Sequence, residues 1–131
     1  MEVLRDIIDK ITHSFENRRN ESGGILGGKK NIITEFCFDR ECTKYEYIPD
    51  IINVNKIIEE WNKQDIDFMG FVHSHKDNCN LSYADIEYAR KIISVNNVKY
   101  IHMFLYVNKN NEIIDYIVNM YDVIKTNINL V

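Results

Sequence analysis

The chain has 131 residues, of which 45% are hydrophobic and 27% are charged. This composition excludes an intrinsically disordered chain, and the length fits one hydrophobic core, so we assign residues 1–131 to a single domain. A formal net charge of −4, with Lys and Arg scattered along the chain, argues against nucleic acid as a partner.

The hydrophobic pattern predicts helices and strands in irregular alternation. Apolar residues recur at helical spacing in 2–17, 51–63 and 82–95, which we assign to helices. Shorter apolar or alternating runs predict strands at 21–28, 32–38, 43–48, 66–75, 100–107 and 112–120. We expect 32–38 to pair with 43–48 as a hairpin. This order favours a mixed α/β fold over a doubly wound parallel sheet.

The segment His73-Ser74-His75 closes the predicted strand at 66–75. Residues two apart on a strand point to the same face, so both imidazoles can bind one ion. Asp85 follows in the first turn of the next predicted helix, where a tight loop can bring its carboxylate alongside. Two His and one carboxylate leave a fourth tetrahedral position open, which is typical of catalytic zinc, and a water bound there has a pKa of roughly 7.

Each part of this pattern also has a purely structural explanation. A buried histidine is usually a hydrogen-bonded core residue, and Ser82-x-x-Asp85 matches a helix capping box. Glu21, just before Ser22-Gly23-Gly24-Ile25-Leu26-Gly27-Gly28, could be a general base or an exposed residue at a strand start. The His pair and Asp85 together favour a metal site.

Taken together, these residues resemble a known signature. Glu21 with the glycine-rich segment, then Gly70-x-x-His73-Ser74-His75, then Ser82-x-x-Asp85, is similar to the motif of JAMM (MPN-type, Mov34-like) zinc metalloproteases, in particular small prokaryotic single-domain members. The resemblance covers essentially the whole chain. It implies an MPN-like, cytidine-deaminase-like domain with a curved, mostly antiparallel sheet flanked by helices.

The resemblance also implies the roles of individual residues. His73, His75 and Asp85 would bind Zn2+, Glu21 would activate a metal-bound water, and Ser82 would stabilise the oxyanion. Ser74 would orient the site. The implied reaction is hydrolysis of a peptide or isopeptide bond in a protein or peptide substrate, including the tails of ubiquitin-like or sulfur-carrier proteins. The long insertions of eukaryotic deubiquitinating relatives are absent, so we do not expect efficient cleavage of ubiquitin chains.

The sequence departs from the family pattern between His75 and Ser82. The loop has six residues, Lys76 to Leu81, where seven are usual, and the common prolines are missing. Asp77 is therefore an alternative ligand. Cys79 could approach the metal or be an exposed free thiol. His13 and His102 have no partner pattern, and we predict structural roles for both.

Other enzyme classes and one non-enzyme class are alternatives to this interpretation. His73-x-His75-x-Asp77 also resembles the start of metallo-β-lactamase-like hydrolases, which need further histidines and a longer chain, as does the barrel of H-x-H amidohydrolases. The C-x-x-C of zinc deaminases is absent. The remaining alternative is a non-catalytic MPN scaffold or protein-binding module, although such relatives have usually lost the zinc ligands.

The sequence also predicts a compartment. No basic segment followed by an apolar one opens the chain, and no apolar run reaches the roughly 18 residues of a membrane span. The cysteines are odd in number and form no C-x-x-C pair, namely Cys37, Cys42 and Cys79. We therefore expect a cytoplasmic protein with reduced thiols and no membrane partner.

Overall fold

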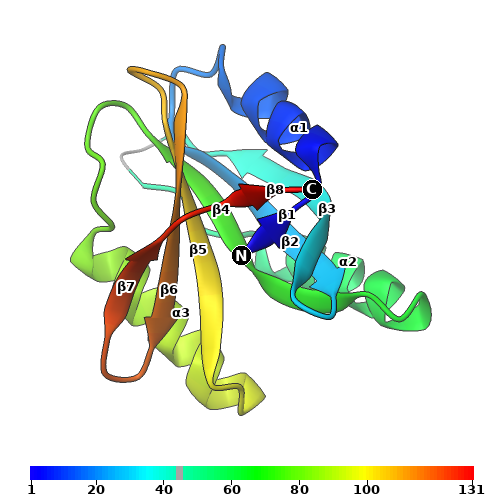
Figure 1. The fold of residues 1–131 in the computed structure, drawn as a ribbon. Coiled ribbons are helices and arrows are strands. Elements are labelled where there is room, and N and C mark those ends of the chain that lie inside the picture. Colours follow the sequence, from blue (N-terminus) through cyan, green and yellow to red (C-terminus); the bar gives the residue numbers. More distant parts are fainter. Residues whose placement is uncertain (44–45) are drawn as a thin grey trace.

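The structure is a computed structural model that describes residues 1–43 and 46–131. Over these residues it contains one eight-stranded sheet and three helices (Figure 1). In chain order the elements are β1 (Glu2–Val3), α1 (Arg5–Phe15), β2 (Ser22–Lys29), β3 (Ile32–Glu41), α2 (Ile51–Lys63), β4 (Asp67–His75), α3 (Tyr83–Asn96), β5 (Tyr100–Val107), β6 (Glu112–Asn119), β7 (Val123–Thr126) and β8 (Asn129–Leu130).

The sheet is mixed and mostly antiparallel. Its strand order is β7-β6-β5-β4-β2-β3-β1-β8, and β2 pairs antiparallel with both β3 and β4. The hairpins β5–β6 and β6–β7 are also antiparallel, whereas β4–β5 and the pairings of the short strand β1 with β3 and β8 are parallel. Figure 1 shows the sheet strongly curved. The predicted fold class is confirmed.

Helices cover both faces of the sheet, and each face has its own core. On one face, α1 buries Ile7, Ile11 and Phe15 against residues such as Val72 and Phe104. On the other face, α2 and α3 pack on a second cluster, and α3 lies behind β6 in Figure 1. Because side chains alternate along a strand, neighbouring residues of β4 and β5 contribute to opposite cores.

The predicted hairpin between 32–38 and 43–48 is wrong. Strand β3 continues to Glu41 and pairs with the strand before it, β2, across a two-residue turn. The turn residues Lys30 and Asn31 both have positive φ, 49° and 67°, which is the backbone of the tight hairpin turn that matches strand twist. Residues 43 and 46–48 form no strand, and residues 44–45 lie outside the described part.

The ends of the chain also differ from the prediction. The first helix begins at Arg5, because Glu2 and Val3 instead pair in parallel with β3 and β8. The C-terminal stretch, which has no clear pattern in the sequence, supplies β7 and β8. Figure 1 shows β1 and β8 side by side, whereas β7 lies at the opposite edge of the sheet.

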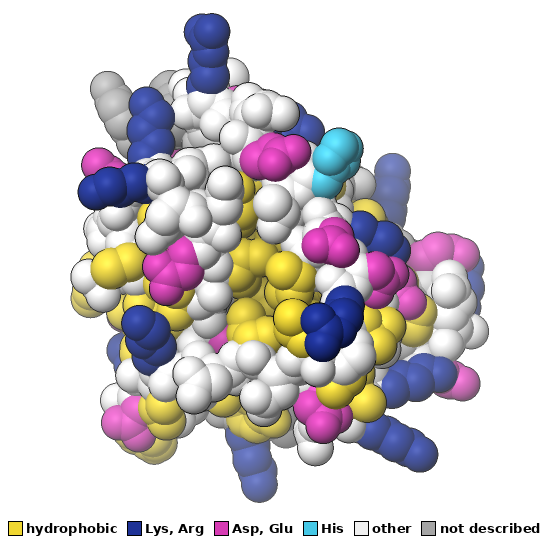
Figure 2. Space-filling model, turned by 45° about the horizontal axis from the view of Figure 1, so that its top comes forward, with side chains coloured by type: hydrophobic (Ala, Val, Ile, Leu, Met, Phe, Trp, Pro, Cys, Tyr) yellow, Lys and Arg dark blue, Asp and Glu magenta, His cyan; other side chains and the backbone are white. Residues whose placement is uncertain are grey.

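The surface carries charged residues of both signs. On the face shown in Figure 2, acidic and basic side chains surround a hollow in which hydrophobic side chains gather. Within the described residues, no helix combines the length and the hydrophobicity needed to cross a membrane. The three cysteines are free thiols.

Candidate metal centre

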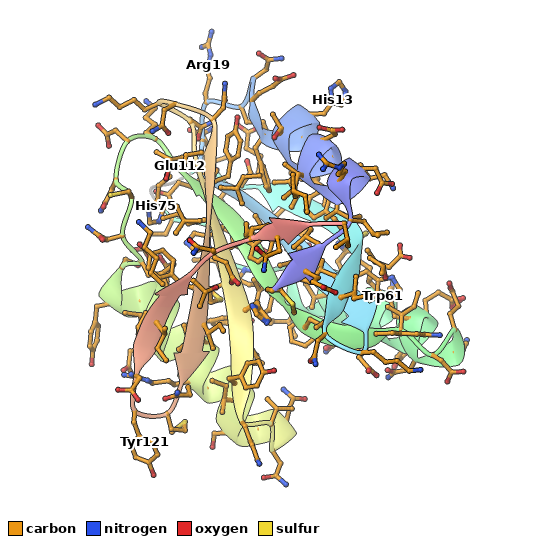
Figure 3. The ribbon with its side chains drawn as sticks, in the orientation of Figure 1. His13, Arg19, Trp61, His75, Glu112 and Tyr121 are labelled. Carbon is orange, nitrogen blue, oxygen red and sulfur yellow. The ribbon has the colours of Figure 1, made fainter. Side chains whose placement is uncertain are left out.

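The His pair lies at the end of β4, an interior strand between β2 and β5. His73 and His75 are buried, with 1% and 6% of their surface exposed, and their ring centroids are 4.9 Å apart. Both occupy the same face of the strand as Phe71, on the side covered by α2 and α3. Figure 3 shows His75 at this end of β4, beside the loop that leads to α3.

A glycine three residues before the pair lets β4 lie close to β5. Gly70 has a φ of +151°, and a Cβ there would come within 1.8 Å of the His102 carbonyl oxygen. Such a contact and such a backbone are compatible only with glycine. From Gly70 opposite His102, the parallel register continues to His75 opposite Val107. Gly70 therefore helps to fix where the strand ends and where the histidines lie.

Asp85 reaches the histidines from the first turn of α3. Its Oδ2 lies 3.0 Å from Nε2 of His73 and 3.4 Å from Nε2 of His75. Ser82 is the N-cap of the helix, and the two residues form a complete capping box. The Asp85 amide donates to Ser82 Oγ at 3.1 Å, and the Ser82 amide donates to Asp85 Oδ2 at 2.9 Å. The capping-box explanation of the Ser82-x-x-Asp85 pattern is therefore confirmed, and the box also directs the carboxylate toward the histidines.

The three donors lie close enough together to bind one metal ion. Each of His73, His75 and Asp85 offers one donor atom, and these atoms all lie within 4.8 Å of one another. Ligands about 2.0–2.1 Å from zinc at tetrahedral angles are roughly 3.3 Å apart, close to the observed spacings of the Asp85 oxygen from the two ring nitrogens. Two imidazoles and one carboxylate also form the donor set that leaves one coordination position open.

The loop after β4 fixes the ring orientation of His75. Its Nδ1 lies 3.3 Å from the Asn78 carbonyl oxygen, so Nδ1 carries the proton and Nε2 is directed toward Asp85. The loop itself is tied down, because the Tyr116 hydroxyl donates to the Cys79 carbonyl at 2.6 Å. The six-residue loop 76–81 is thus long enough to place the N-terminus of α3 beside His73 and His75. Backbone contacts of this kind leave no signal in the sequence.

Glu21 lies beside the three donors but is not one of them. Strand β2 begins at Ser22, and Gly23 pairs with His73, so Glu21 lies level with His75. Its Oε1 is 3.8 Å from Nε2 of His75, and its side chain is 25% exposed. Glu21 is therefore close to the donor group and still partly accessible to solvent.

Burial and mutual contacts shift the pKa values of these groups. Burial raises the pKa of Glu21, although the nearby His75 and His73 oppose the change. Burial also acts to raise the pKa of Asp85, but hydrogen bonds from His73 and His75 outweigh it and hold the pKa far below its usual value. The pKa of His75 rises despite burial, because Asp85 accepts its hydrogen bond and Glu21 is negatively charged. The Asp85 carboxylate is thus ionised at neutral pH and can bind a cation.

The two predicted serines lie on different sides of the site. Ser82 Oγ accepts from the Asp85 amide, which leaves its hydroxyl proton free to donate to another group near the donors. Ser74 points to the opposite face of β4 from the histidines and is buried. Its Oγ accepts a hydrogen bond from the Ser22 amide at 2.9 Å. Ser74 therefore fixes the backbone directly after Glu21.

The other candidate residues of the sequence do not belong to this cluster. Asp77 and Cys79 are exposed in the loop, and the metal-capable group found in the described part of the chain contains neither. His13 is an exposed residue of α1 and lies well away from His75 in Figure 3. His102 is buried on the opposite face of the sheet and hydrogen-bonds Asp115 at 3.0 Å.

Comparison with known proteins supports the fold. No protein-family model and no curated protein matches the sequence. Solved structures, in contrast, match over nearly the full chain. One is the solution structure of protein DSY2949 from Desulfitobacterium hafniense, with a TM-score of 0.79 at 13% identity, covering 99% of this chain and 92% of that one.

Two further structures have JAB1/MPN or JAMM descriptions. AF2198, a JAB1/MPN domain protein from Archaeoglobus fulgidus, has a TM-score of 0.63 at 17% identity and covers 100% of this chain and 97% of its own. A structure described as "JAMM: A Metalloprotease-like Zinc Site in the Proteasome and Signalosome" has a TM-score of 0.59 at 18% identity, with the same coverage. At these identities the likeness establishes an MPN-type fold, which agrees with the resemblance in the motifs.

Proposed function

We propose that this protein is a metal-dependent hydrolase of the JAMM type that cleaves peptide or isopeptide bonds. The observation that carries the proposal is the convergence of His73, His75 and Asp85, with all donor atoms within 4.8 Å of one another. Glu21 lies beside this group without belonging to it, and the fold is that of MPN-type domains. Zinc is the metal that best suits two imidazoles and a carboxylate with one position open.

Glu21 is the general base of the proposed reaction. A zinc ion held by His73, His75 and Asp85 would polarise the scissile carbonyl and make a water molecule more acidic. Glu21 takes a proton from the attacking water as the new C–O bond forms. It then delivers that proton to the nitrogen as the C–N bond breaks, so the products are a carboxylate and an amine. Partial burial raises its pKa, which suits a group that must both accept and release a proton near neutral pH.

Ser82 and Ser74 assist this reaction in different ways. The free hydroxyl proton of Ser82 is available to the oxyanion that develops on the carbonyl oxygen, and the capping box holds the hydroxyl in place beforehand. Ser74 lies on the face of β4 opposite the histidines. It binds the Ser22 amide and so positions the backbone that carries Glu21.

Proteins that end in a ubiquitin-like or sulfur-carrier tail are the first substrate class to test, and small peptides are the nearest variant. An extended tail suits a site at the end of a strand, flanked by a loop and a helix N-terminus. A non-catalytic MPN scaffold is the competing proposal. It accounts for the fold, but it gives no reason for three converging donors and an adjacent glutamate.

The experiment that tests the proposal compares zinc-loaded and chelated protein on peptides and on lysine-linked isopeptides. The zinc-loaded protein should release a free amine, and chelation should abolish the release until zinc is restored. A Glu21→Gln variant is the matched control, because it keeps the metal ligands and the shape of the side chain. Hydrolysis that is indifferent to zinc, or that is unchanged in the Gln variant, would remove the proposed mechanism.

A further inference from the structure

The segment at 46–50 forms no helix or strand and lies beside the candidate metal centre. Its Tyr47 forms part of the wall of a pocket that also contains His73 and Asp85. The ring of Tyr47 packs over Gly23, where an added Cβ would come within 2.3 Å of the ring. Only glycine leaves room for so close an approach. Tyr47 therefore packs directly on β2, near the start of that strand.

The backbone of Tyr47 also contacts Glu21. The Glu21 carbonyl accepts from the Cys42 amide at 2.9 Å, which continues the pairing of β2 with β3 by one residue. Glu21 and Gly23 therefore lie two apart in extended chain and face the same side, the side that Tyr47 covers. Burial raises the pKa of Glu21, and a hydrogen bond from the Tyr47 backbone is among the contacts that oppose this rise. The Tyr47 amide thus helps to fix the direction of the Glu21 carboxylate.

Asp39, in β3, holds this segment on the sheet. Its Oδ2 accepts from the Tyr47 hydroxyl at 2.7 Å and from the Asp50 amide at 2.9 Å. Its Oδ1 accepts from the Asn53 side chain at 2.8 Å. Burial raises the pKa of the Tyr47 phenol and the bond to Asp39 raises it further, so the hydroxyl keeps its proton and remains a donor. One carboxylate thus joins Tyr47 to the start of α2.

We propose that Asp39 is a positioning residue for Glu21. Asp39 holds Tyr47, and the Tyr47 amide holds the Glu21 carboxylate, whose Oε1 lies 3.8 Å from Nε2 of His75. Among the described residues, Asp39 belongs to neither the donor group nor the pocket wall, so it acts through Tyr47. The inference rests on the proposed function, because it concerns the base of that reaction. Without this support the carboxylate samples more rotamers, and the chemical step slows.

The first test compares Asp39→Ala with Asp39→Asn in the zinc-loaded protein. The Ala variant removes the acceptor and should lower kcat by roughly ten- to a hundredfold, the effect of a misplaced catalytic group. The Asn variant keeps an acceptor oxygen for the Tyr47 hydroxyl, so its kcat should stay within about threefold of the wild type. Zinc content should not change in either. An unchanged kcat in the Ala variant, or an effect on KM alone, would overturn the inference, because a change in the pocket wall acts on substrate binding.

Two hydroxyl deletions separate positioning from a general loss of stability. Tyr47→Phe removes one donor from the Asp39 carboxylate, and Thr126→Val removes one from the buried Asp115 carboxylate. Only Tyr47→Phe should lower kcat, by roughly two- to tenfold, the worth of one hydrogen bond. Both variants are assayed at a temperature at which circular dichroism shows them folded. Equal falls in kcat would reduce the effect to stability and contradict the proposed role of Asp39.

A double variant tests whether Asp39 acts through Glu21. In the Glu21→Gln background the base is already lost, so Asp39→Ala should lower the residual rate by less than about twofold, because residues that act as a unit have non-additive effects. The same fold decrease in both backgrounds would show that Asp39 acts by a route that does not include Glu21.

An NMR measurement on the metal-free protein separates this inference from the proposed reaction. The Tyr47 amide signal should move in Glu21→Gln, which removes the charge that the amide binds, and in Asp39→Ala. Glu16→Gln removes an exposed carboxylate at the end of α1 and should leave the signal in place. A signal that responds in a protein without hydrolytic activity would contradict the proposed function and leave the positioning contact standing. Hydrolysis with a signal that does not respond would contradict the positioning and leave the reaction standing. A protein with neither property would refute both proposals.

Discussion

Asp85 combines its structural role as part of a helix cap with the proposed role of metal ligand. Its carboxylate accepts from the Ser82 amide at 2.9 Å and lies 3.0 Å from His73. A capping side chain is held in a fixed orientation, because the backbone that it binds is already ordered by the helix. The cap therefore orients the carboxylate before any ion arrives, and the hydrogen bonds from the histidines keep its pKa low.

Glu21 provides the clearest test at the scale of a single residue. Replacing Glu21 with Ala should lower hydrolysis by roughly 10²–10⁴-fold, the usual contribution of a general acid–base group. Zinc content should not change, because Glu21 is beside the donor group and not within it. Metal analysis and a peptide assay on the same preparation check both parts. A fall in zinc content equal to the fall in rate would make Glu21 a ligand instead.

At the scale of elements, the N-terminus of α3 allows a test that separates stability from hydrolysis. Ser82→Ala removes the N-cap and should destabilise the protein by about 1 kcal/mol, whereas Ser82→Gly should cost only a few tenths of that. Both variants lack the hydroxyl, so both should lose hydrolysis by roughly 10²-fold or more. Urea unfolding and peptide hydrolysis separate the two effects. A Gly variant with full activity would leave Ser82 as a helix cap alone.

The short strand β7 depends on a buried polar contact. Thr126 Oγ1 donates to Asp115 Oδ2 at 2.8 Å, and the other oxygen of Asp115 lies 3.0 Å from His102 Nδ1. Thr126→Val keeps the shape of the side chain but removes one hydrogen-bond donor from the buried Asp115 carboxylate. The free energy of unfolding should therefore fall by roughly 1.5–3 kcal/mol. Thr43→Val, at an exposed position, should change it by less than about 0.5 kcal/mol. Equal effects in both variants would argue against the contact.

Local signals explain which elements the sequence reveals. The helix α2 has the predicted bounds, 51–63, because its apolar residues keep helical spacing and Asp50 caps its start. The predicted partner of β3 is wrong, because the alternation at 43–48 resembles a strand, whereas the turn at Lys30 and Asn31 pairs β3 with β2. Strands of two residues, such as β8, have no periodicity to detect and exist through pairing with another strand.

The candidate site was predictable to the extent that its residues form motifs. The order of Glu21, the His pair and the Ser82-x-x-Asp85 segment is visible in the chain, and the strand period brings the two histidines together. The supporting contacts are not visible. The Asn78 carbonyl, the Tyr116 hydroxyl and the wall formed by Tyr47 depend on how distant segments pack.

At the scale of the whole molecule, metal binding should stabilise the fold. The donors come from β4 and α3, so an ion that joins them should oppose unfolding of either element. At a free zinc concentration a hundredfold above Kd, the free energy of unfolding should rise by roughly 2.7 kcal/mol. Thermal unfolding with and without zinc measures the effect, and magnesium, which prefers oxygen ligands, is the control ion. Equal stabilisation by both ions would argue against a site built on the His pair.

The most direct measurement is the zinc content of the purified protein and of His75→Ala, determined by mass spectrometry after removal of loosely bound metal. The account predicts one zinc per wild-type chain and a sharp loss in the variant, because His75 supplies one of the three donors. Wild-type protein that holds no zinc when zinc is supplied, or a variant that holds as much as the wild type, would contradict the metal centre and the hydrolase proposed from it.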